Sequence, residues 1–392
     1  MYIPRVAAPK LQSLAQQFKA VAVIGPRQSG KTTLVRKLFP ERPYVSLENP
    51  EQRRFAQEDP RGFLATYPDG AILDEVQRVP SLLSWLQQRL DEEERRGTFV
   101  LTGSNNFLLL EQITQSLAGR VAYVDLLPLS LEELLAEKGG LRLLNEQLWQ
   151  GGYPAVRAEQ IAPEDWFPAY LRTYVERDVR QIKNLENLAA FEKLIALCAG
   201  RVGQLVNYSN LAVEVGVDVK TVKSWLGILQ ASYVVHLLPP YFKNFNKRVV
   251  KTPKLYFYDT GLASHLLRIN SAEDLINHPM RGPLFENLVV TELLKSRFNR
   301  GQRSNLYFWR DRSGLEVDIL LDLGGKVWPI EVKSGQTITS AFFKGLEKWQ
   351  GLSGEAGGWV FFGGEDGQKR SSGIEVKSWQ ALASSNLYQE LG

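Results

Sequence analysis

The sequence has few residues that could build covalent or metal cross-links. Its 392 residues include one cysteine, Cys198, and three widely spaced histidines, His236, His265 and His278. This scarcity excludes an intrachain disulfide and a cysteine-built metal site, and it argues against a histidine-built zinc site. No apolar run approaches the ~20 residues that span a bilayer, and the opening MYIPRVAAPK lacks the apolar core of a secretory signal. We therefore expect a cytoplasmic protein with no membrane partner.

Composition is that of an ordinary globular protein. Hydrophobic residues make up 44% of the chain and charged residues 23%, which permits large cores and argues against wholesale disorder. A chain of 392 residues predicts about two to four domains. Because the net charge is only +4, it indicates no particular class of partner, and function must be inferred from local motifs.

The strongest motif is a glycine-rich loop near the start of the sequence. The stretch GPRQSGKT is a full G-x-x-x-x-G-K-[ST] pattern, preceded by the apolar run Ala20–Ile24 and followed by Thr33–Leu38, which has helical composition. Glycines let backbone N–H groups wrap phosphates, and the following helix adds its positive dipole end. Lys31 would reach the β- and γ-phosphates, and the Thr32 hydroxyl would bind Mg²⁺. The predicted ATP-binding residues are Gly25, Pro26, Arg27, Gln28, Ser29, Gly30, Lys31, Thr32 and Thr33.

Two later strands end in polar side chains. The apolar run Ala71–Leu73 leads into Asp74 and Glu75, at the sheet edge where such sites assemble. Asp74 would hold Mg²⁺, and Glu75 would orient or deprotonate the attacking water. The strand Thr98–Leu101 ends in a polar segment, whose candidates for holding that water or sensing the γ-phosphate are Ser104 and Asn105.

Two arginines each allow two interpretations. Arg120 precedes the apolar stretch Val121–Leu127; it is either a surface residue or an arginine finger supplied to a neighbouring subunit in a ring-shaped homo-oligomer. Arg177, in the helical stretch Trp166–Leu185, either contacts the γ-phosphate or belongs to an i,i+4 ladder of charges on a solvated helix.

These motifs carry a resemblance to a known family. The succession of strands resembles the five-stranded AAA+ core. The segments GPRQSGKTTL, YVSLENPEQRRFAQEDP, ILDEVQRVPSLL, LTGSNNFLLL and SLAGRVAYVDLLPLS resemble a family of bacterial and archaeal predicted ATPases. Members of that family carry a C-terminal domain that resembles restriction endonucleases. The resemblance spans nearly the whole chain and implies an AAA+ type ATPase, without implying a substrate.

The middle of the chain favours a winged helix. The sequence predicts a helix–turn–helix, with helices at Tyr208–Val215 and Val219–Gln230. Asp218, in the tight turn between them, is a suitable N-cap for the second helix, and the apolar strand Tyr233–Leu238 follows. Winged helices place such a second helix in a groove of DNA, and others bind proteins. Between Tyr241 and Lys254 five cations occur with no acid, which suits a phosphate backbone, although a solvated loop has the same composition. The predicted DNA-binding residues are Lys220, Lys223, Lys243, Lys247, Arg248 and Lys251. The stretch Lys295–Arg312 is similarly basic.

The last hundred residues predict an α-β-β-β-α-β succession that resembles the PD-(D/E)XK nuclease core. Strand residues two apart point the same way, so Glu331 and Lys333 share one face of a predicted strand. Asp318, on the neighbouring strand, would complete a carboxylate pair for Mg²⁺; Lys333 would orient the attacking water, and Glu286 would add a ligand from an amphipathic helix. Val317 stands where the usual pattern has proline.

The sequence therefore predicts an α/β protein acting on DNA with ATP and Mg²⁺ as cofactors. Its predicted function is that of an ATP-hydrolysing motor or remodeller with Mg²⁺-dependent cleavage at the C-terminal site. The alternative is a regulatory ATPase switch whose C-terminal domain binds DNA or protein without cutting. The predicted domains are an ATPase core at 1–128, a helical lid at 129–185, a winged helix at 186–255, a linker at 256–283 and a nuclease-like domain at 284–392.

Overall fold

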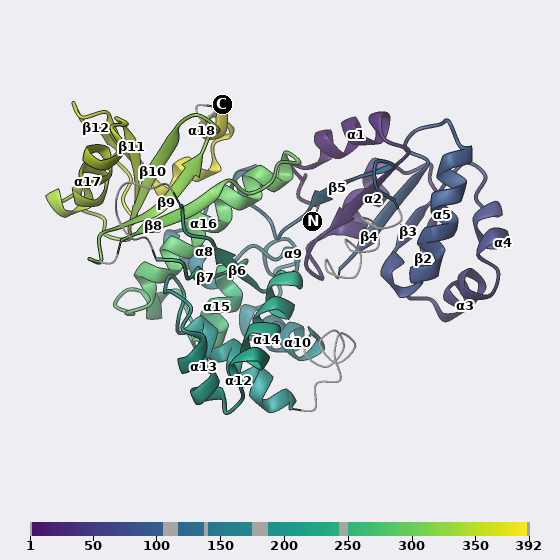
Figure 1. Cartoon of the computed structure of the whole chain (residues 1–392), viewed down its shortest axis with the longest axis horizontal. Coiled ribbons are helices and arrows are strands. Elements are labelled where there is room, and N and C mark those ends of the chain that lie inside the picture. Colours follow the sequence, from purple (N-terminus) through teal and green to yellow (C-terminus); the bar gives the residue numbers. More distant parts are fainter. Residues whose placement is uncertain are drawn as a thin grey trace.

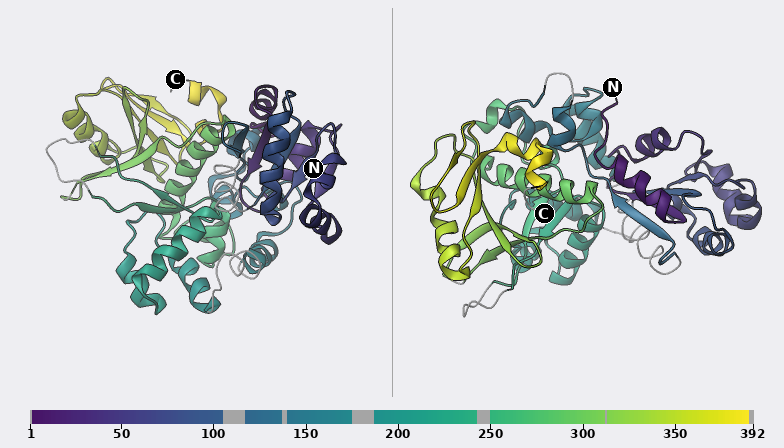
Figure 2. Two further views of the ribbon diagram at one scale, coloured as in Figure 1. Left: turned by 45° about the vertical axis from the view of Figure 1, so that its right-hand side comes forward. Right: turned by 90° about the horizontal axis from the view of Figure 1, so that it is seen from above.

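The computed structural model describes residues 2–104, 117–136, 140–174, 187–242, 250–311 and 313–389. Two β-sheets lie at opposite ends of the molecule, with a group of helices between them, as both Figure 1 and Figure 2 show. The sheet at one end belongs to the first third of the chain, and the sheet at the other end belongs to the last quarter. None of the helices in these ranges is long and apolar enough to cross a membrane.

The first sheet is parallel and has the strand order β2-β3-β4-β1-β5. Alternate residues of β1 enter two different cores, as the two-residue period of a strand requires: Val21 and Val23 pack in one and Ala20 and Ala22 in the other. Strands β1, β3, β4 and β5 fall on the apolar stretches identified in the sequence. The strands are β1 (Ala20–Ile24), β2 (Tyr44–Ser46), β3 (Ile72–Asp74), β4 (Phe99–Gly103) and β5 (Val121–Asp125), and the helices are α1 (Ala8–Gln17), α2 (Lys31–Leu38), α3 (Pro50–Glu58), α4 (Pro60–Ala65) and α5 (Pro80–Glu92).

Short helices follow the first sheet. The sequence favours one helical stretch over 131–148, whereas the structure has two helices, α7 and α8, because residues 140–143 are not helical. Gly151, with a φ of +64°, caps the C-terminal end of α8. The helices of this segment are α7 (Leu131–Leu135), α8 (Leu144–Gln150), α9 (Pro154–Arg157) and α10 (Pro163–Thr173).

The predicted helix–turn–helix is confirmed in the next segment. Asp218 caps the second helix, and its Oδ1 accepts the Thr221 N–H at 2.8 Å. Val222 and Leu229 are fully buried on one face of that helix. The elements are α12 (Leu188–Ala199), α13 (Tyr208–Val215), α14 (Val219–Ala231), β6 (Val235–Leu238) and β7 (Lys254–Phe257), with the two strands paired antiparallel.

The last quarter forms a six-stranded mixed sheet with the order β12-β13-β11-β10-β9-β8. Strands β8, β9 and β10 are antiparallel neighbours, whereas β11 pairs parallel to β10 after the crossover helix α17. The order of helix, three strands, helix and strand agrees with the sequence prediction. The elements are α16 (Arg281–Asn299), β8 (Leu306–Arg310), β9 (Glu316–Asp322), β10 (Val327–Lys333), α17 (Lys344–Ser353), β11 (Gly358–Phe362), β12 (Gln368–Lys369), β13 (Ile374–Ser378) and α18 (Ser385–Gln389).

Two predictions about this region are wrong. Residues 256–283 are not a linker, because they carry the end of β7 and the helix α15 (Thr260–Leu266), whose Leu262 is buried in the main core. Helix α16 is not amphipathic, because nearly every residue from Leu284 to Ser296 is buried. One continuous core runs from Leu127 through these helices to Leu387, so the parts are packed against one another.

Candidate functional site

The phosphate loop leaves the carboxyl end of β1, where two glycines adopt conformations that other residues avoid. Gly25 has a φ of +150°, and a Cβ at this position would lie 2.2 Å from the carbonyl oxygen of Leu126. Only glycine lets the loop approach the end of β5 so closely. Gly30, with a φ of +94°, directly precedes Lys31, the first residue of α2. The loop therefore ends on a helix N-terminus, as a phosphate site requires.

Lys31 is buried within its own loop. Its Nζ donates to the carbonyls of Gly25 at 3.0 Å and Pro26 at 2.7 Å, which places the ammonium among the residues that would wrap a phosphate.

The Thr32 hydroxyl donates to Asp74 Oδ1 at 3.1 Å, so the two predicted Mg²⁺ ligands lie side by side. Carboxylate and hydroxyl oxygens suit a hard cation. Asp74 also accepts hydrogen bonds from the hydroxyl groups of Thr102 and, at 2.6 Å, Tyr44. Burial and the contact with Asp74 raise the pKa of Tyr44 to about 12. Sequence reasoning missed Tyr44 and Thr102, although both lie on strands next to β3.

Glu75 follows β3 with a φ of +56°, a left-handed conformation that is uncommon for a non-glycine residue. Its Oε2 accepts the Ser104 hydroxyl at 3.0 Å and lies 2.5 Å from Gln77 Nε2. Glu75 lines the same cleft as Lys31, which suits the predicted role toward an attacking water. Ser104 is thus connected to the cleft by its hydrogen bond to Glu75. Asn105 lies outside the described residues.

A cleft of about 660 Å³ separates the phosphate loop from helices α9 and α10. Pro154, Trp166, Tyr170 and Thr173 form part of its far wall. The opposite wall contains Arg27, Gln28, Gly30, Lys31, Thr32 and Thr33 from the predicted loop. The helical lid predicted from the sequence thus faces the phosphate site.

The two arginines with open roles are placed differently. Arg120 lies just before β5, at the amino ends of the parallel strands, whereas the phosphate loop lies at their carboxyl ends. Arg120 pairs with Asp91 at 2.5 Å. It is not among the described residues that line the cleft of its own chain. Arg177 lies outside the described residues.

In the C-terminal sheet, the three predicted residues converge on one pocket of about 440 Å³. Lys333 Nζ lies 2.5 Å from Glu331 Oε2 and 3.3 Å from Asp318 Oδ2. Asp318 also accepts the backbone N–H of Val332 at 2.8 Å. Within the described residues, no group of three or more acidic, histidine or cysteine side chains is arranged to hold a metal ion. Two carboxylates of the pocket are thus bonded to one ammonium, and a third, that of Glu316, also lines the pocket and pairs with Lys254 and Arg310.

The electrostatics of this pocket are strongly coupled. Burial and the charge of Asp318 hold the pKa of Glu331 well above its usual value. Burial alone would raise the pKa of Asp318, but the ammonium groups of Lys333 and Lys254 outweigh it and lower that pKa. The pKa values of the two carboxyl groups are therefore shifted in opposite directions, as expected for like charges that share a site.

Glu286 departs from its predicted role. It is not among the described residues that line the pocket. Its Oε1 accepts from Lys254 Nζ at 2.9 Å and from the Tyr256 hydroxyl at 2.5 Å, and Lys254 also pairs with Glu316. Glu286 is therefore bonded to a lysine and a tyrosine from β7 and does not join Asp318 and Glu331 in the pocket.

The predicted DNA-binding residues lie on two segments. Lys220 and Lys223 are exposed on α14, and Lys251 is exposed just before β7, whereas Lys243, Lys247 and Arg248 lie outside the described residues. The second basic stretch, 295–312, begins inside the protein, although Arg303 within it is exposed. Lys295 is buried and bonded to Glu292 at 2.7 Å and to the Leu129 carbonyl at 2.9 Å.

The fold and the phosphate site define a class of protein. A parallel five-stranded sheet, a G-x-x-x-x-G-K-[ST] loop, and Asp74 and Glu75 at the end of the adjacent strand characterise a P-loop ATPase. Residues 17–135 match the family described as AAA domain. Residues 141–273 and 281–382 match two domains of unknown function, DUF8612 and DUF4143. The protein is therefore a nucleotide-binding ATPase of the AAA type.

The relatives identify its family more closely. Uncharacterized proteins of Mycobacterium tuberculosis and Mycobacterium bovis are 31% identical over 340 residues, covering 85% of this chain and 74% of each relative. The chain belongs to the family that includes these two proteins. An uncharacterized protein of Methanocaldococcus jannaschii is 25% identical over 277 residues, covering 64% of this chain and 58% of its own.

Solved structures show more distant similarity. The Walker-type ATPase of Pyrococcus abyssi has a TM-score of 0.42 at 15% identity, covering 67% of this chain and 95% of that one. A RuvB variant of Thermotoga maritima has a TM-score of 0.30 at 15% identity, covering 60% of this chain and 90% of that one.

Proposed function

We propose that this ATPase acts on DNA as an ATP-driven motor or remodeller, and that its C-terminal pocket cleaves a phosphodiester with the help of Mg²⁺. The observation that carries the proposal is the convergence of Asp318, Glu331 and Lys333 in one open pocket. One buried and one partly buried carboxylate beside an ammonium are costly to retain for stability alone, whereas they suit a phosphodiester and a divalent cation.

The arrangement of elements supports a nuclease-like domain. The succession from α16 through three antiparallel strands to α17 and the parallel strand β11 resembles the PD-(D/E)XK core. Asp318 lies on β9, and Glu331 and Lys333 lie on β10, where that core carries its acids and lysine. The departure is Val317, which is buried in place of the usual proline.

The residues of the pocket have distinct roles in the proposed hydrolysis. A water oxygen bonds to phosphorus and its surplus proton passes to bulk water, the bond from phosphorus to a sugar oxygen breaks, and the leaving oxygen takes up a proton from bulk water. Lys333 would orient that water and offset the charge that develops on the phosphate oxygens. Asp318 and Glu331 supply carboxylate oxygens, which suit Mg²⁺; the ion, when bound, would stabilise negative charge. Glu286 is left out of this set, because Lys254 and Tyr256 hold it.

Cations near the pocket support a nucleic-acid substrate. Lys344 and Lys348 are exposed, line the pocket and lie one helical turn apart on α17. The basic stretch between Tyr241 and Lys254 contacts the edge strand β8 from both of its described ends. The Tyr241 N–H donates to the Phe308 carbonyl at 2.7 Å, and the Val250 N–H donates to the Arg310 carbonyl at 3.1 Å. We propose that a DNA strand follows this edge toward the pocket.

A winged helix in the middle of the chain is part of the proposal. The order is α12, a bridge between Leu205 and Lys254, helices α13 and α14, and the paired strands β6 and β7. This is the order of a helix–turn–helix followed by a β-hairpin. The exposed Lys220 and Lys223 on α14 would face DNA.

The test measures ATP turnover and nicking in the same preparations. ATP hydrolysis is measured alone and with single-stranded, duplex and branched DNA, and strong stimulation by one form supports the motor. Nicking that requires Mg²⁺ or Mn²⁺ and disappears in Lys333→Ala supports the nuclease. Lys344→Ala combined with Lys348→Ala should weaken DNA binding, while Lys326→Ala, an exposed lysine on the β9–β10 turn, should not. A protein that cleaves no DNA or RNA under any of these conditions contradicts the nuclease proposal.

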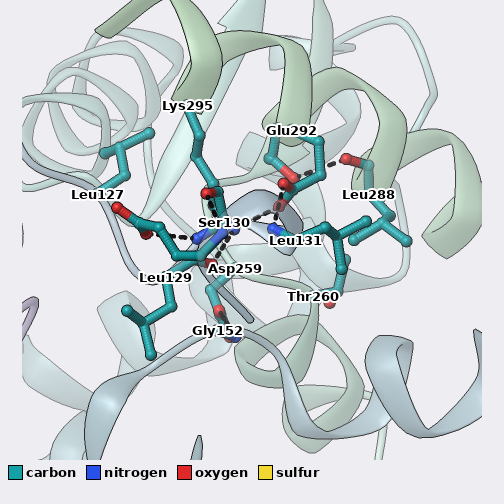
Figure 3. Close-up of polar contacts among 12 residues, drawn as sticks. Leu127, Leu129, Ser130, Leu131, Gly152, Asp259, Thr260, Leu288, Glu292 and Lys295 are labelled. Carbon is teal, nitrogen blue, oxygen red and sulfur yellow. Dashed lines mark hydrogen bonds and ion pairs between the residues drawn. The ribbon is translucent and has the colours of Figure 1, made fainter. Parts of the chain in front are cut away.

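A second candidate function is a nucleotide-controlled switch, and a buried polar network favours it. Figure 3 shows Glu292 and Lys295 of α16 holding the segment that joins β5 to α7. The Leu131 N–H donates to Glu292 Oε2 at 2.7 Å, and Lys295 donates to the Leu129 carbonyl at 2.9 Å. The Leu129 N–H in turn donates to the Gly152 carbonyl at 2.7 Å. The ATPase core is therefore tied to the helix that precedes the C-terminal sheet. Stimulation of ATP turnover by a protein partner, with no response to DNA, would favour this switch.

A further inference from the structure

Arg5, in the segment before α1, is buried behind the phosphate loop. Its Nη1 donates to the Ser29 carbonyl at 2.6 Å, its Nη2 to the Leu127 carbonyl at 2.7 Å, and its Nε to Glu133 at 2.9 Å. The side chains of Arg5 and Glu133 are 4% and 0% exposed. A planar guanidinium fixes several acceptors at once, so Arg5 joins the loop to the end of β5 and to α7.

The geometry of the Ser29–Gly30 peptide links the contact with Arg5 to the side of the loop that faces the phosphates. In a planar trans peptide, the carbonyl of one residue and the N–H of the next point in opposite directions. The Ser29 carbonyl points toward Arg5, so the Gly30 N–H points away from it. Gly30 lines the cleft, and the N–H groups of this loop type cradle the α- and β-phosphates. Arg5 thereby fixes the direction of one phosphate donor.

The partner of Arg5 is held independently. Glu133 Oε1 accepts the Val6 N–H at 2.8 Å, and Oε2 accepts the Ser130 N–H at 2.8 Å in a capping box at the start of α7. Arg5 is therefore held in one orientation by Glu133 and by the carbonyls of Ser29 and Leu127.

We propose that Arg5 is a positioning residue of the ATPase, which holds the Ser29–Gly30 peptide so that its N–H faces the phosphates of the nucleotide. The proposal rests on the assignment of the chain as an ATPase. Because this donor serves ADP and ATP alike, its loss should weaken the binding of both and leave turnover at saturating ATP close to that of the native protein.

The test compares Arg5→Met, Arg5→Lys and the double variant Arg5→Met/Glu133→Met. ADP binding is measured by titration calorimetry, and kcat and KM by ATP turnover. Arg5→Met should bind ADP on the order of tenfold more weakly, as expected for one charge-assisted backbone donor. It also leaves Glu133 buried without its cation, which destabilises the fold. The double variant removes both charges but also the acceptor of the Val6 and Ser130 N–H groups, so its melting temperature should recover in part while its ADP affinity stays low.

The controls separate positioning from folding. Arg96→Met removes an exposed arginine that donates to one carbonyl, that of Gln17, and should bind ADP normally. Arg5→Lys keeps the charge beside Glu133 but lacks the fork, so it should fold and still bind ADP more weakly than the native protein. Native ADP affinity in the double variant or in Arg5→Lys would overturn the proposal. Failure of the native protein itself to bind ADP would instead contradict the ATPase assignment.

Discussion

Glu331 and Gly345 approach so closely that no larger residue fits at position 345. A Cβ on Gly345 would lie 2.0 Å from Glu331 Oε1 and 3.1 Å from the carbonyl of Glu316. Because Lys333 holds the other oxygen of the same carboxylate, Glu331 cannot give way without leaving its place in the pocket. Helix α17 therefore fixes the geometry of the C-terminal site as much as the strands do.

The contact predicts opposite effects for two glycines of α17. Gly345→Ala should displace the Glu331 carboxylate and abolish nicking by the C-terminal pocket. Gly351→Ala, where a Cβ meets nothing within 4 Å, should leave nicking unchanged and stabilise the helix by about 0.5–1 kcal/mol. Nicking assays and thermal melts of both variants check this. Equal nicking by both would show that the position of Glu331 is unimportant.

The phosphate site predicts separable defects. Lys31→Ala should abolish nucleotide binding, because it removes the cation of the loop. Glu75→Gln should bind ATP normally and stall hydrolysis, since the amide cannot take a proton from water. Binding is measured by titration calorimetry and hydrolysis by phosphate release. Turnover at the native rate in Glu75→Gln would contradict the role given to this residue.

Arg120 offers a test of assembly. If it is a finger for a neighbouring subunit, Arg120→Ala should lose hydrolysis while keeping ATP affinity, and the hydrolysis per subunit of the native protein should rise with concentration. Asp91→Asn is the matched control, since it breaks the same exposed ion pair and leaves the arginine. Normal turnover in Arg120→Ala would assign this residue to the surface.

DNA affinity should map to the exposed lysines of α14 and the basic segment. Replacing Lys220 and Lys223, or separately Lys243, Lys247, Arg248 and Lys251, with alanine should weaken binding and flatten its salt dependence, by about 0.9 in slope for each lost phosphate contact. Fluorescence anisotropy at several salt concentrations measures both quantities. Unchanged affinity and slope would indicate that the middle domain contacts protein.

The stability of the fold should depend on Asp125. Burial raises the pKa of this carboxyl to about 6, although its hydrogen bond from Tyr233 acts in the opposite direction. With the folded pKa above the unfolded value near 3.8, stability falls as pH rises from about 4 through 6 and stays low above it. At 1.36 kcal/mol per pKa unit, the loss is at most about 3 kcal/mol. Asp125→Asn should raise the unfolding free energy at pH 7 and remove this slope in urea titrations.

Asp91 is the matched control for Asp125, because its pKa is shifted in the opposite direction. The hydrogen bond from Arg120 lowers the pKa of the exposed Asp91, so its contribution to stability is lost as pH falls. Asp91→Asn should therefore leave the slope between pH 4 and 6 in place. The same slope in Asp125→Asn as in the native protein would assign that slope to another group.

Sequence reasoning placed residues correctly where the pattern is local, and the roles given to those residues stay predictions. The loop glycines follow from a motif of fixed spacing, the acids fall at the end of the single strand β3, and Glu331 and Lys333 share a face of β10 because a strand has a two-residue period. They required no knowledge of which segments lie side by side.

The residues that sequence reasoning missed depend on long-range packing. Arg5 lies more than 120 residues from Glu133 in the chain, and Tyr44 and Thr102 reach Asp74 from different strands. Lys254 comes from the middle domain to meet Glu286, which no local pattern indicates. Helix α16 differs from the predicted amphipathic helix because neighbouring parts of the fold bury it, so polar residues such as Glu292 pair internally instead of facing water.

The division of the apolar cores has a consequence for synthesis on the ribosome. The two cores that flank the first sheet are made from residues 7–126, so this part can pack as soon as it has emerged. The main core needs Leu382 and Leu387 as well as Leu127 and Leu129. The apolar faces of the lid and middle helices therefore stay exposed to solvent until almost the last residues of the chain have been synthesised. We expect the nascent protein to bind nucleotide well before translation ends and to depend on chaperones during that interval.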